Sequence, residues 1–321
     1  MKIKLIITFI LFIIFIIIIK NKHFKDFNYI NDINKSDYEN IEFAIIKRLE
    51  CPICGLFSDY IVYLGCINLF LTKGFLPIIN FGSFNYNLKS NNSNNTLIDN
   101  QWEFFFYQPL GYTLNDIIKN AKNIQFFECN SSIFRPDENI FFNKVLLNFW
   151  HNIAKIYLPI KKNILIEVNS IKKNLFGNSN NILGILIRGT DYIAMKPKNH
   201  SIPPTSSMVI KDLKEFYLKN KYDYFFISTE DDLIREQFIK EFNSKLKFLI
   251  SKKINYDYKS KNYLYLNQNI DLKFIKIYLL NMIILSKCID IITARTSGAL
   301  GVFILSNGFR NSKIYNLGYY I

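Results

Sequence analysis

Cysteine is scarce in this chain, and the few cysteines argue against a domain held together by disulfides. Five cysteines occur among 321 residues, and an odd total does not fit a framework of paired cysteines. Cys51 and Cys54 have the spacing of half a zinc site or of a redox pair, but no second CxxC and no HxxxH follows to complete four ligands. We therefore expect this pair to be plain thiols, and we expect no metal site.

The sequence also lacks an arginine-rich block and any motif of a nucleic-acid-binding module. Its net charge of +14 suits an anionic partner such as a nucleotide, a membrane surface or a nucleic acid. Because the basic residues are scattered along the chain, we expect no nucleic-acid partner.

A long apolar run stands at the N-terminus. Leu5 to Ile19 contains no charged residue, and a helix of about this length spans roughly 25 Å, slightly less than a bilayer core. Lysines and bulky residues follow it, whereas a cleaved signal peptide requires small residues near its cleavage point. We therefore predict an uncleaved single-pass membrane anchor at 1–22 and a polar tether at 23–40. The small excess of lysines after the run favours a cytoplasmic body, with the Golgi lumen as the alternative in a eukaryotic cell.

The rest of the chain alternates between strand-like and helix-like segments, which predicts an α/β fold with parallel sheets. In the first half we predict strands at 43–46, 76–79 and 123–128, helices at 59–73 and 113–118, and long helices over 137–176 interrupted near Pro159. In the second half we predict strands at 182–187, 224–228, 246–250, 290–293 and 314–316, a long loop over 188–204, and helices at 205–219, 231–242, 271–288 and 298–306. The turn at 177–180 separates the predicted domains, 41–177 and 178–321.

Polar residues follow three predicted strands of the second half. They are the runs Arg188-Gly189-Thr190-Asp191, Ser228-Thr229-Glu230-Asp231-Asp232 and Thr293-Ala294-Arg295-Thr296-Ser297. The carboxyl ends of parallel strands meet at one edge of a sheet, where open α/β sheets bind their ligands. We therefore expect these three runs to converge on one ligand.

The residue types in these runs suit a nucleotide sugar. Arg188 can donate two parallel hydrogen bonds to a phosphate. Thr296 and Ser297 precede a predicted helix, whose free N–H groups and dipole favour phosphate, although they equally suit a simple helix cap. Asp231 and Asp232 can hold the base or ribose, and they are as readily explained as the N-terminal charges of a helix.

With these motifs in this order, the sequence resembles the fucosyltransferase-like glycosyltransferases, the superfamily of α1,6-, α1,2- and protein O-fucosyltransferases. The run from Leu186 to Tyr192 is similar to the first motif of the superfamily, and the resemblance places Arg188 on the arginine that contacts the donor diphosphate. The runs 227–232 and 285–297 are similar to the second and third motifs. In this chain Leu186 replaces a histidine, Gly189 replaces a second arginine, and Asn281 replaces the aspartate that binds guanine in the α1,6 enzymes.

Further segments resemble a bacterial polysaccharide-biosynthesis branch of this superfamily. They are the runs 102–111 and 196–204, and Gly55 matches the glycine loop of the N-terminal domain. The resemblance covers about residues 42–318. It implies a GT-B-like fold of two Rossmann-like doubly wound domains, here preceded by one transmembrane helix. The N-terminal domain would lie on the acceptor side, and the C-terminal domain would bind the nucleotide sugar.

The predicted function is a membrane-anchored glycosyltransferase that moves fucose from GDP-fucose to a glycan or lipid-linked glycan. The resemblance implies inverting transfer without a metal, with no cofactor besides the donor substrate. We predict Arg188 as the catalytic cation, and Asp191 either as a base or as a residue that orients Arg188. On the donor side we predict Gly55, Thr190, Asp231, Asp232, Asn281, Thr296 and Ser297. On the acceptor side we predict Trp102, Glu103 and His200, where Trp102 and Glu103 equally suit the core and His200 equally suits an ordinary surface position.

Two other functions fit the same sequence. The departures at Leu186, Gly189 and Asn281 are compatible with a non-catalytic protein, derived from such an enzyme, that binds nucleotide sugars or glycans. A membrane protein whose soluble body only binds partners is the third possibility. An assay of donor hydrolysis separates an enzyme from the non-catalytic binding protein. A lack of affinity for GDP-sugars would identify the membrane protein that only binds partners.

Overall fold

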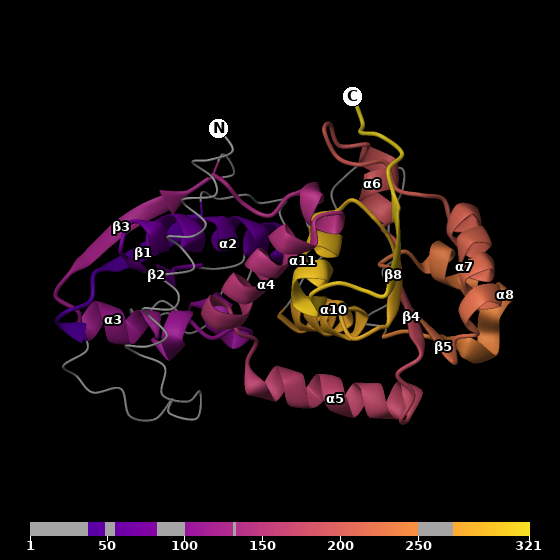
Figure 1. Cartoon of the computed structure of the whole chain (residues 1–321), viewed down its shortest axis with the longest axis horizontal. Coiled ribbons are helices and arrows are strands. Elements are labelled where there is room, and N and C mark those ends of the chain that lie inside the picture. Colours follow the sequence, from indigo (N-terminus) through magenta and orange to yellow (C-terminus); the bar gives the residue numbers. More distant parts are fainter. Residues whose placement is uncertain (1–37, 49–54, 82–99, 131–132, 250–271) are drawn as a thin grey trace.

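The computed structural model describes residues 38–48, 55–81, 100–130, 133–249 and 272–321 (Figure 1). The predicted anchor at 1–22, most of the tether, and Cys51 and Cys54 lie outside these residues. None of the helices within the described ranges is long and apolar enough to cross a membrane.

The first half forms a three-stranded parallel sheet in the order β2-β1-β3. Its strands are β1 (Phe43–Arg48), β2 (Leu76–Ile79) and β3 (Ile124–Cys129). Helix α2 (Leu56–Thr72) joins β1 to β2 and starts three residues before the predicted 59, because Leu56 and Phe57 bury apolar surface in its first turn. Gly74 follows the helix with a φ of 86°, a left-handed conformation that glycine adopts without steric cost.

The first half contains further helices, of which the two 3₁₀ turns within 101–111 were not predicted. They are the 3₁₀ turns η2 (Gln101–Phe104), η3 (Pro109–Gly111) and η4 (Glu138–Phe141), and the helices α3 (Leu114–Asn120), α4 (Lys144–Tyr157) and α5 (Lys162–Phe176). Thr113, where the predicted helix 113–118 begins, caps α3, since its hydroxyl oxygen accepts a hydrogen bond from the backbone N–H of Asp116 at 3.1 Å. The break between α4 and α5 falls at Pro159, as expected for a residue without an N–H.

The second half forms a five-stranded sheet, in the order β6-β5-β4-β7-β8, whose neighbouring strands are all parallel. Its strands are β4 (Ile182–Leu186), β5 (Tyr224–Ser228), β6 (Leu246–Lys247), β7 (Asp290–Ala294) and β8 (Asn311–Tyr315). The parallel α/β prediction is confirmed. Because β4 lies at the centre, the carboxyl ends of β5 and β7 flank its own.

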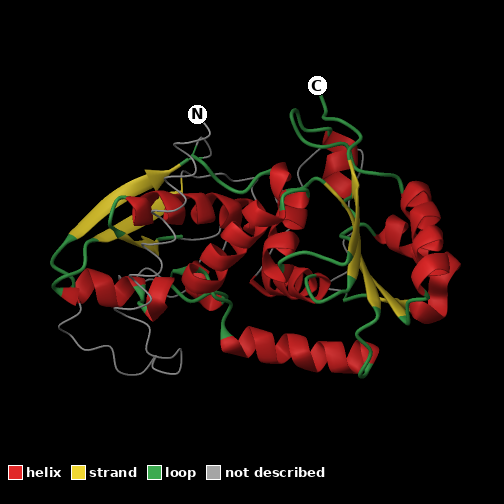
Figure 2. Ribbon diagram, in the orientation of Figure 1, coloured by secondary structure: helices red, strands yellow, loops and turns green. Residues whose placement is uncertain are grey.

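Helices cover both faces of this second sheet (Figure 2). Helices α7 (Ser206–Asn220) and α8 (Asp232–Phe242) lie on one face, where Leu213 and Phe238 pack with the β4 residue Ile185. On the other face, α10 (Leu272–Leu285) and α11 (Ser297–Ser306) separate the sheet from the first half (Figure 1).

Several details of the second half differ from the sequence prediction. Strand β6 is shorter than the predicted 246–250, and β8 begins at 311 instead of the predicted 314. Thr190–Met195 forms a short helix, α6, in a segment predicted to be a loop. The chain turns there because the backbone N–H groups of Gly189 and Thr190 donate hydrogen bonds to carboxylates in the segment after β5. Leu233 in the predicted helix 231–242 is 59% exposed although it is apolar. Ile234 and Phe238, four residues apart, form the buried stripe, and Leu233 lies one helical step outside it.

The two halves share one apolar core. Helix α11 packs against α2 so closely that a Cβ atom at Gly301 would overlap the ring of Phe57. The ring of Phe303 lies 4.8 Å from that of Phe141, and the His151 Nδ1 lies 2.6 Å from the carbonyl oxygen of Ile304. Helix α11 therefore belongs to the second half by sequence and to both halves by packing.

A disulfide joins Cys66 of α2 to Cys129 at the end of β3, with Cα atoms 6.2 Å apart. The argument from an odd number of cysteines against disulfides is therefore wrong for this pair. The two cysteines are 63 residues apart in sequence, and only the packing of α2 on the first sheet brings them together. Among the described residues, Cys288 is a buried free thiol.

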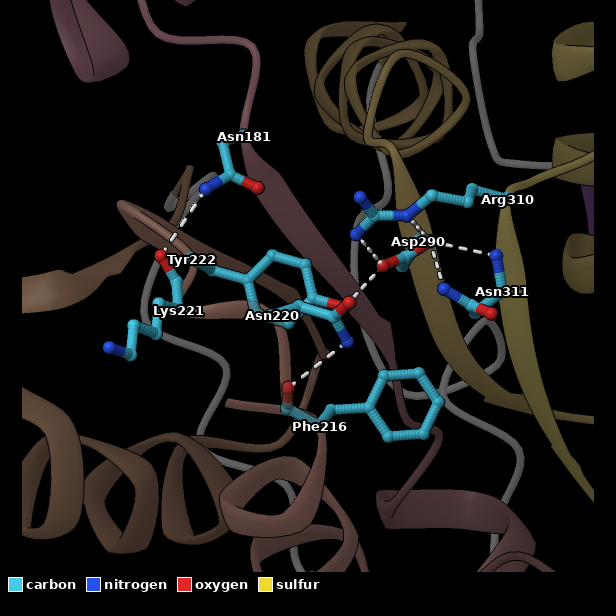
Figure 3. Close-up of polar contacts among 8 residues, drawn as sticks. All are labelled: Asn181, Phe216, Asn220, Lys221, Tyr222, Asp290, Arg310 and Asn311. Atoms are coloured by element: carbon cyan, nitrogen blue, oxygen red, sulfur yellow. Dashed lines mark hydrogen bonds and ion pairs between the residues drawn. The ribbon is translucent and has the colours of Figure 1, made fainter. Parts of the chain in front are cut away.

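A buried carboxylate, Asp290, stabilises the opposite edge of the second sheet, at the amino end of β7 (Figure 3). It accepts hydrogen bonds from the Tyr222 hydroxyl, from the Arg310 guanidinium and from the backbone N–H of Asn311 at 2.7 Å. Burial opposes its ionisation, but these donors outweigh burial and lower the pKa of Asp290. This network is structural, because it lies at the edge away from the strand ends that carry Arg188 and Arg295.

Removal of the disulfide is expected to destabilise the protein. Closing a loop of this length restricts the unfolded chain, which corresponds to about 4 kcal/mol in the chain-entropy model. Replacing both Cys66 and Cys129 by serine should lower the free energy of unfolding, measured in urea, toward that of the reduced wild type. The double variant should be insensitive to reductant, whereas a wild type that reductant leaves unchanged would contradict the pairing.

The close contact between α2 and α11 gives a second expectation. Gly301→Ala should lower the free energy of unfolding by about 1–3 kcal/mol, because overlap with Phe57 outweighs the better helix propensity of alanine. In a Phe57→Leu background the same substitution should cost less. A double-mutant cycle measures this coupling, and additive effects of the two substitutions would rule the contact out.

Candidate active site

The register of the second sheet places three charged residues in one row at its carboxyl edge. Leu186 of β4 pairs with Ser228 of β5 on one side and with Thr293 of β7 on the other. Two residues beyond these partners come Arg188 on the central connection, Glu230 beside it and Arg295 on the far side. The prediction that these three strand ends meet is confirmed by this register.

The segment after β4 is attached to the segment after β5 by hydrogen bonds. The carboxylate of Glu230 accepts from the backbone N–H of Gly189 at 3.0 Å and from the Thr190 hydroxyl at 3.2 Å. The Arg188 Nε lies 4.0 Å from the same Glu230 oxygen. Glu230 therefore orients the chain that carries Arg188 and partly balances its charge.

Asp231 stabilises the same turn through hydrogen bonds to its carboxylate. It is 2% exposed, and it accepts from the backbone N–H of Thr190 at 3.1 Å and from the first-turn N–H groups of α8, including that of Leu233 at 2.9 Å. A Cβ atom at Gly189 would collide with this carboxylate, so a glycine is required there. Thr190 has a φ of 42°, an unusual value for a β-branched residue, which these hydrogen bonds stabilise.

Arg188 also interacts with an aromatic ring. Its guanidinium carbon lies 3.9 Å from the ring centroid of Tyr192, one turn into α6. The Tyr192 hydroxyl lies 2.7 Å from the Nδ1 of His200, which is exposed. His200 thus comes close to the predicted catalytic arginine through Tyr192. The backbone of Asp191 lies in α6, and its side chain is outside what the structure describes.

The end of β7 leads directly into α11. The Thr296 hydroxyl caps this helix by accepting from the backbone N–H of Ala299 at 3.1 Å, and Ser297 is exposed at its first position. The free N–H groups of such a helix start favour an anion. Thr296 and Ser297 therefore lie where the sequence predicted, beside the row of charged residues.

Arg295 joins the two halves of the protein. Its Nη1 donates to Glu138 of η4 at 2.6 Å, and the Tyr319 hydroxyl donates to the same carboxylate. Its backbone carbonyl accepts from the hydroxyl of Ser201, in the loop that carries His200. That loop pairs with the C-terminal segment, for example through the N–H of Asn199 and the carbonyl of Tyr320 at 2.9 Å.

Two predicted donor residues take part in local interactions. Asp232 pairs with Arg235 one turn along α8, so its carboxylate is partly occupied. Asn281 of α10 is 7% exposed and donates to the carbonyl of Ile277 at 2.9 Å, while its buried Oδ1 has no hydrogen-bond partner among the described residues. Gly55 is the N-cap residue of α2 and has an extended conformation. It lies two residues before Phe57, whose ring contacts Gly301 of α11.

Trp102 is part of the core, whereas Glu103 beside it is partly exposed and belongs to a local hydrogen-bond network. Trp102 is fully buried, and its ring stacks on Phe106 with centroids 4.4 Å apart. Glu103 accepts from the side chains of Asn100 and Gln108 and from the backbone N–H of Leu114 at 3.0 Å. Burial leaves the Trp102 side chain no surface for an acceptor, while the acceptor role of Glu103 stays a prediction.

Sequence reasoning missed Glu230, Arg295 and Glu138 as site residues. Glu230 and Arg295 lie inside the polar runs at the strand ends, and equal spacing beyond the strands could have indicated them. Glu138 lies in η4, 157 residues before its partner Arg295, and no sequence pattern marks it.

The carboxyl end of β1 carries a separate buried ion pair. Arg48 donates to Asp59 in the first turn of α2 and, at 3.5 Å, to the Ser58 hydroxyl. Its backbone N–H donates to the Tyr63 hydroxyl at 3.3 Å. Burial raises the pKa of Asp59 to about 7, although the neighbouring Arg48 guanidinium acts in the opposite direction.

No protein-family model matches the chain, and the curated proteins give no match. Among solved structures, the fold is similar to POFUT1 in complex with GDP, with a TM-score of 0.52 and 10% identity over 86% of this chain and 99% of that one. For another crystal form of POFUT1 in complex with GDP, the TM-score is 0.51 and the identity 9%, over 85% of this chain and 99% of that one. For the fucosyltransferase NodZ from Bradyrhizobium, the TM-score is 0.49 and the identity 13%, over 82% of this chain and 92% of that one. The fold of the chain is therefore similar to that of POFUT1, a fold that agrees with the one the motifs led us to expect.

The raised pKa of Asp59 predicts a pH dependence of stability. Its folded-state pKa of about 7 lies above the unfolded value of about 3.9, so its contribution to stability is full below the lower value and is lost as pH rises to the higher one. The stability of the wild type relative to Asp59→Asn should therefore fall from pH 5 to pH 7, by at most about 1.4 kcal/mol per pH unit. Urea unfolding of both proteins measures this, and parallel pH profiles would contradict it.

Proposed function

We propose that this protein is a glycosyltransferase whose donor is a nucleoside diphosphate sugar. The observation that carries the proposal is the row of charged residues at the carboxyl edge of the second sheet, with Arg188 at its centre and the start of α11 beside it. A cation and free helix N–H groups at such an edge suit a diphosphate. The similarity of the fold to POFUT1 in complex with GDP supports the proposed nucleoside diphosphate donor.

In its finer form, the proposed donor is GDP-fucose and the product is a fucosylated glycan. An acceptor hydroxyl oxygen forms a bond to the anomeric carbon of the sugar, with inversion, while the bond from that carbon to the diphosphate oxygen breaks. The electron pair leaves with the diphosphate, whose growing negative charge Arg188 stabilises without a metal. Asp191 is the proposed acceptor of the hydroxyl proton. Gly55, Thr190, Thr296 and Ser297 are the proposed donor contacts near this charge.

The roles proposed for the remaining predicted residues are narrower. Asp231 orients the turn of Gly189 and Thr190 rather than touching the donor, because its carboxylate is occupied by backbone N–H groups. The buried Oδ1 of Asn281 supports a proposed contact with the base. Asp232 stays a proposed donor residue, and His200 stays the proposed residue on the acceptor side.

We further propose that the N-terminal segment anchors this enzyme to a membrane and that the acceptor is a glycan or lipid-linked glycan. The Cys66–Cys129 disulfide supports a body in an oxidising compartment, since structural disulfides are rare in the cytosol. It therefore favours a lumenal or external location over the cytoplasmic location that the lysines near the anchor suggest.

Replacement of Arg188 tests the proposed function. Arg188→Ala should lower the rate at which GDP is released from GDP-fucose by about 100-fold or more, because the departing diphosphate loses its stabilising cation. The rate is measured with the full chain, with and without glycan acceptor, and EDTA should leave the wild-type rate unchanged.

The control is Lys276→Ala, which removes a cation paired with Glu167 on the protein surface and should keep the wild-type rate. Near-normal turnover by Arg188→Ala, with an unchanged melting temperature, would refute the proposed role. Tight binding of GDP-fucose by the wild type without any turnover would instead identify a non-catalytic binding protein.

A further inference from the structure

We propose that Arg295 is a second diphosphate-binding arginine and that Glu138 is its counter-ion while the donor site is empty. In this arrangement the donor diphosphate replaces the Glu138 carboxylate on Arg295. The inference rests on the proposed function, because it concerns the same nucleotide site. It adds a ligand-binding residue that the sequence motifs did not identify and a competing carboxylate supplied by the other half of the protein.

The first argument is placement. Arg188 and Arg295 stand at equivalent positions, each two residues beyond the paired residues Leu186 and Thr293. Neighbouring strands of a sheet lie about 4.8 Å apart, and an arginine side chain is longer than that. Both guanidinium groups can therefore reach a single ligand that lies over the edge between β4 and β7.

The second argument is the order of charges along this edge. Glu230 lies on the outer side of Arg188, and Glu138 contacts Arg295 from the first half of the chain. The two arginines are thus adjacent, and each interacts with a carboxylate. Adjacent like charges favour an anion between them, and a diphosphate carries enough negative charge to meet both.

The third argument is the state of the Arg295 side chain. A guanidinium has five N–H donors, and Glu138 takes one of them at 2.6 Å. The Nε of Arg295 is buried, and nothing among the described residues accepts a hydrogen bond from it. A purely structural arginine would be expected to use a buried donor. Arg295 therefore keeps donor capacity for a further acceptor.

The fourth argument is that Glu138 can be displaced at modest cost. Its side chain is one-third exposed, so water can solvate the carboxylate once Arg295 turns to a ligand. Glu138 lies in a short 3₁₀ turn, η4, and its second contact is the hydroxyl of Tyr319, which is itself half exposed. Thr296 and Ser297 follow Arg295 directly and begin α11. A phosphate bound by Arg295 would therefore also lie near the free N–H groups at the start of this helix.

Calorimetric titration of the full chain with GDP and with GMP tests the proposal. Arg295→Ala should weaken GDP binding about tenfold or more, the loss expected for a charge-assisted hydrogen-bonded contact, and should change GMP affinity far less. Arg295→Lys, which keeps the charge but not the fork, should lie between the wild type and the alanine variant. Glu138→Gln should tighten GDP binding several-fold, because a competitor for Arg295 is removed.

The opposite signs of these two effects separate the proposal from a structural tie between the halves. A tie predicts that Arg295→Ala and Glu138→Gln both weaken GDP binding and both lower the melting temperature. The matched controls are Glu167→Gln and Lys276→Ala, which change the net charge equally at a surface ion pair 2.6 Å long and should leave GDP affinity within about twofold.

The outcomes also distinguish this inference from the proposed function. If Arg188→Ala abolishes GDP binding while Arg295→Ala keeps it, or if Glu138→Gln weakens it, the role of Arg295 is overturned and the donor site stands. If the wild type binds neither GDP nor GDP-fucose, the proposed donor class itself is overturned. Opposite effects at Arg295 and Glu138, with both controls silent, support the inference.

Discussion

The parallel register of β5, β4 and β7 is the constraint on which the rest of the site depends. It places three strand ends at one level, and thereby brings Glu230, Arg188 and Arg295 into one row. Hydrogen bonds from the turn at Gly189 and Thr190 to Glu230 and Asp231 then fix the direction in which the chain leaves the sheet. A shift of register by one residue would separate the two arginines and would place side chains on the wrong face.

The packing between the halves gives this edge its surroundings. Helix α11 starts at the predicted phosphate site and packs its glycines against α2, so the two halves of the chain share a core. Arg295 donates to the Glu138 carboxylate, and the Tyr319 hydroxyl donates to the same carboxylate. The first half of the chain therefore places a negative charge beside a cation at a strand end of the second half, through residues that are far apart in sequence.

Much of the fold could be predicted from local chemistry. The caps at Thr113, Thr205 and Asp231 and the left-handed position of Gly74 mark element ends that the structure reproduces, because each depends on a few neighbouring residues. The buried strands β2 and β5 have the predicted bounds, since short uncharged runs leave little freedom. The helix α6 was missed because its start depends on hydrogen bonds to residues about 40 positions later.

The sequence by itself determined the parallel α/β class, the positions of most strands and helices, and the polar strand ends at which a ligand site was expected. These properties follow from periodicity and from caps, which act over a few residues. Only the tertiary structure decided that Cys66 pairs with Cys129, that Trp102 belongs to the core, and that Glu138 faces Arg295. Each of these depends on which distant segments pack together, and the chain between them leaves that choice open.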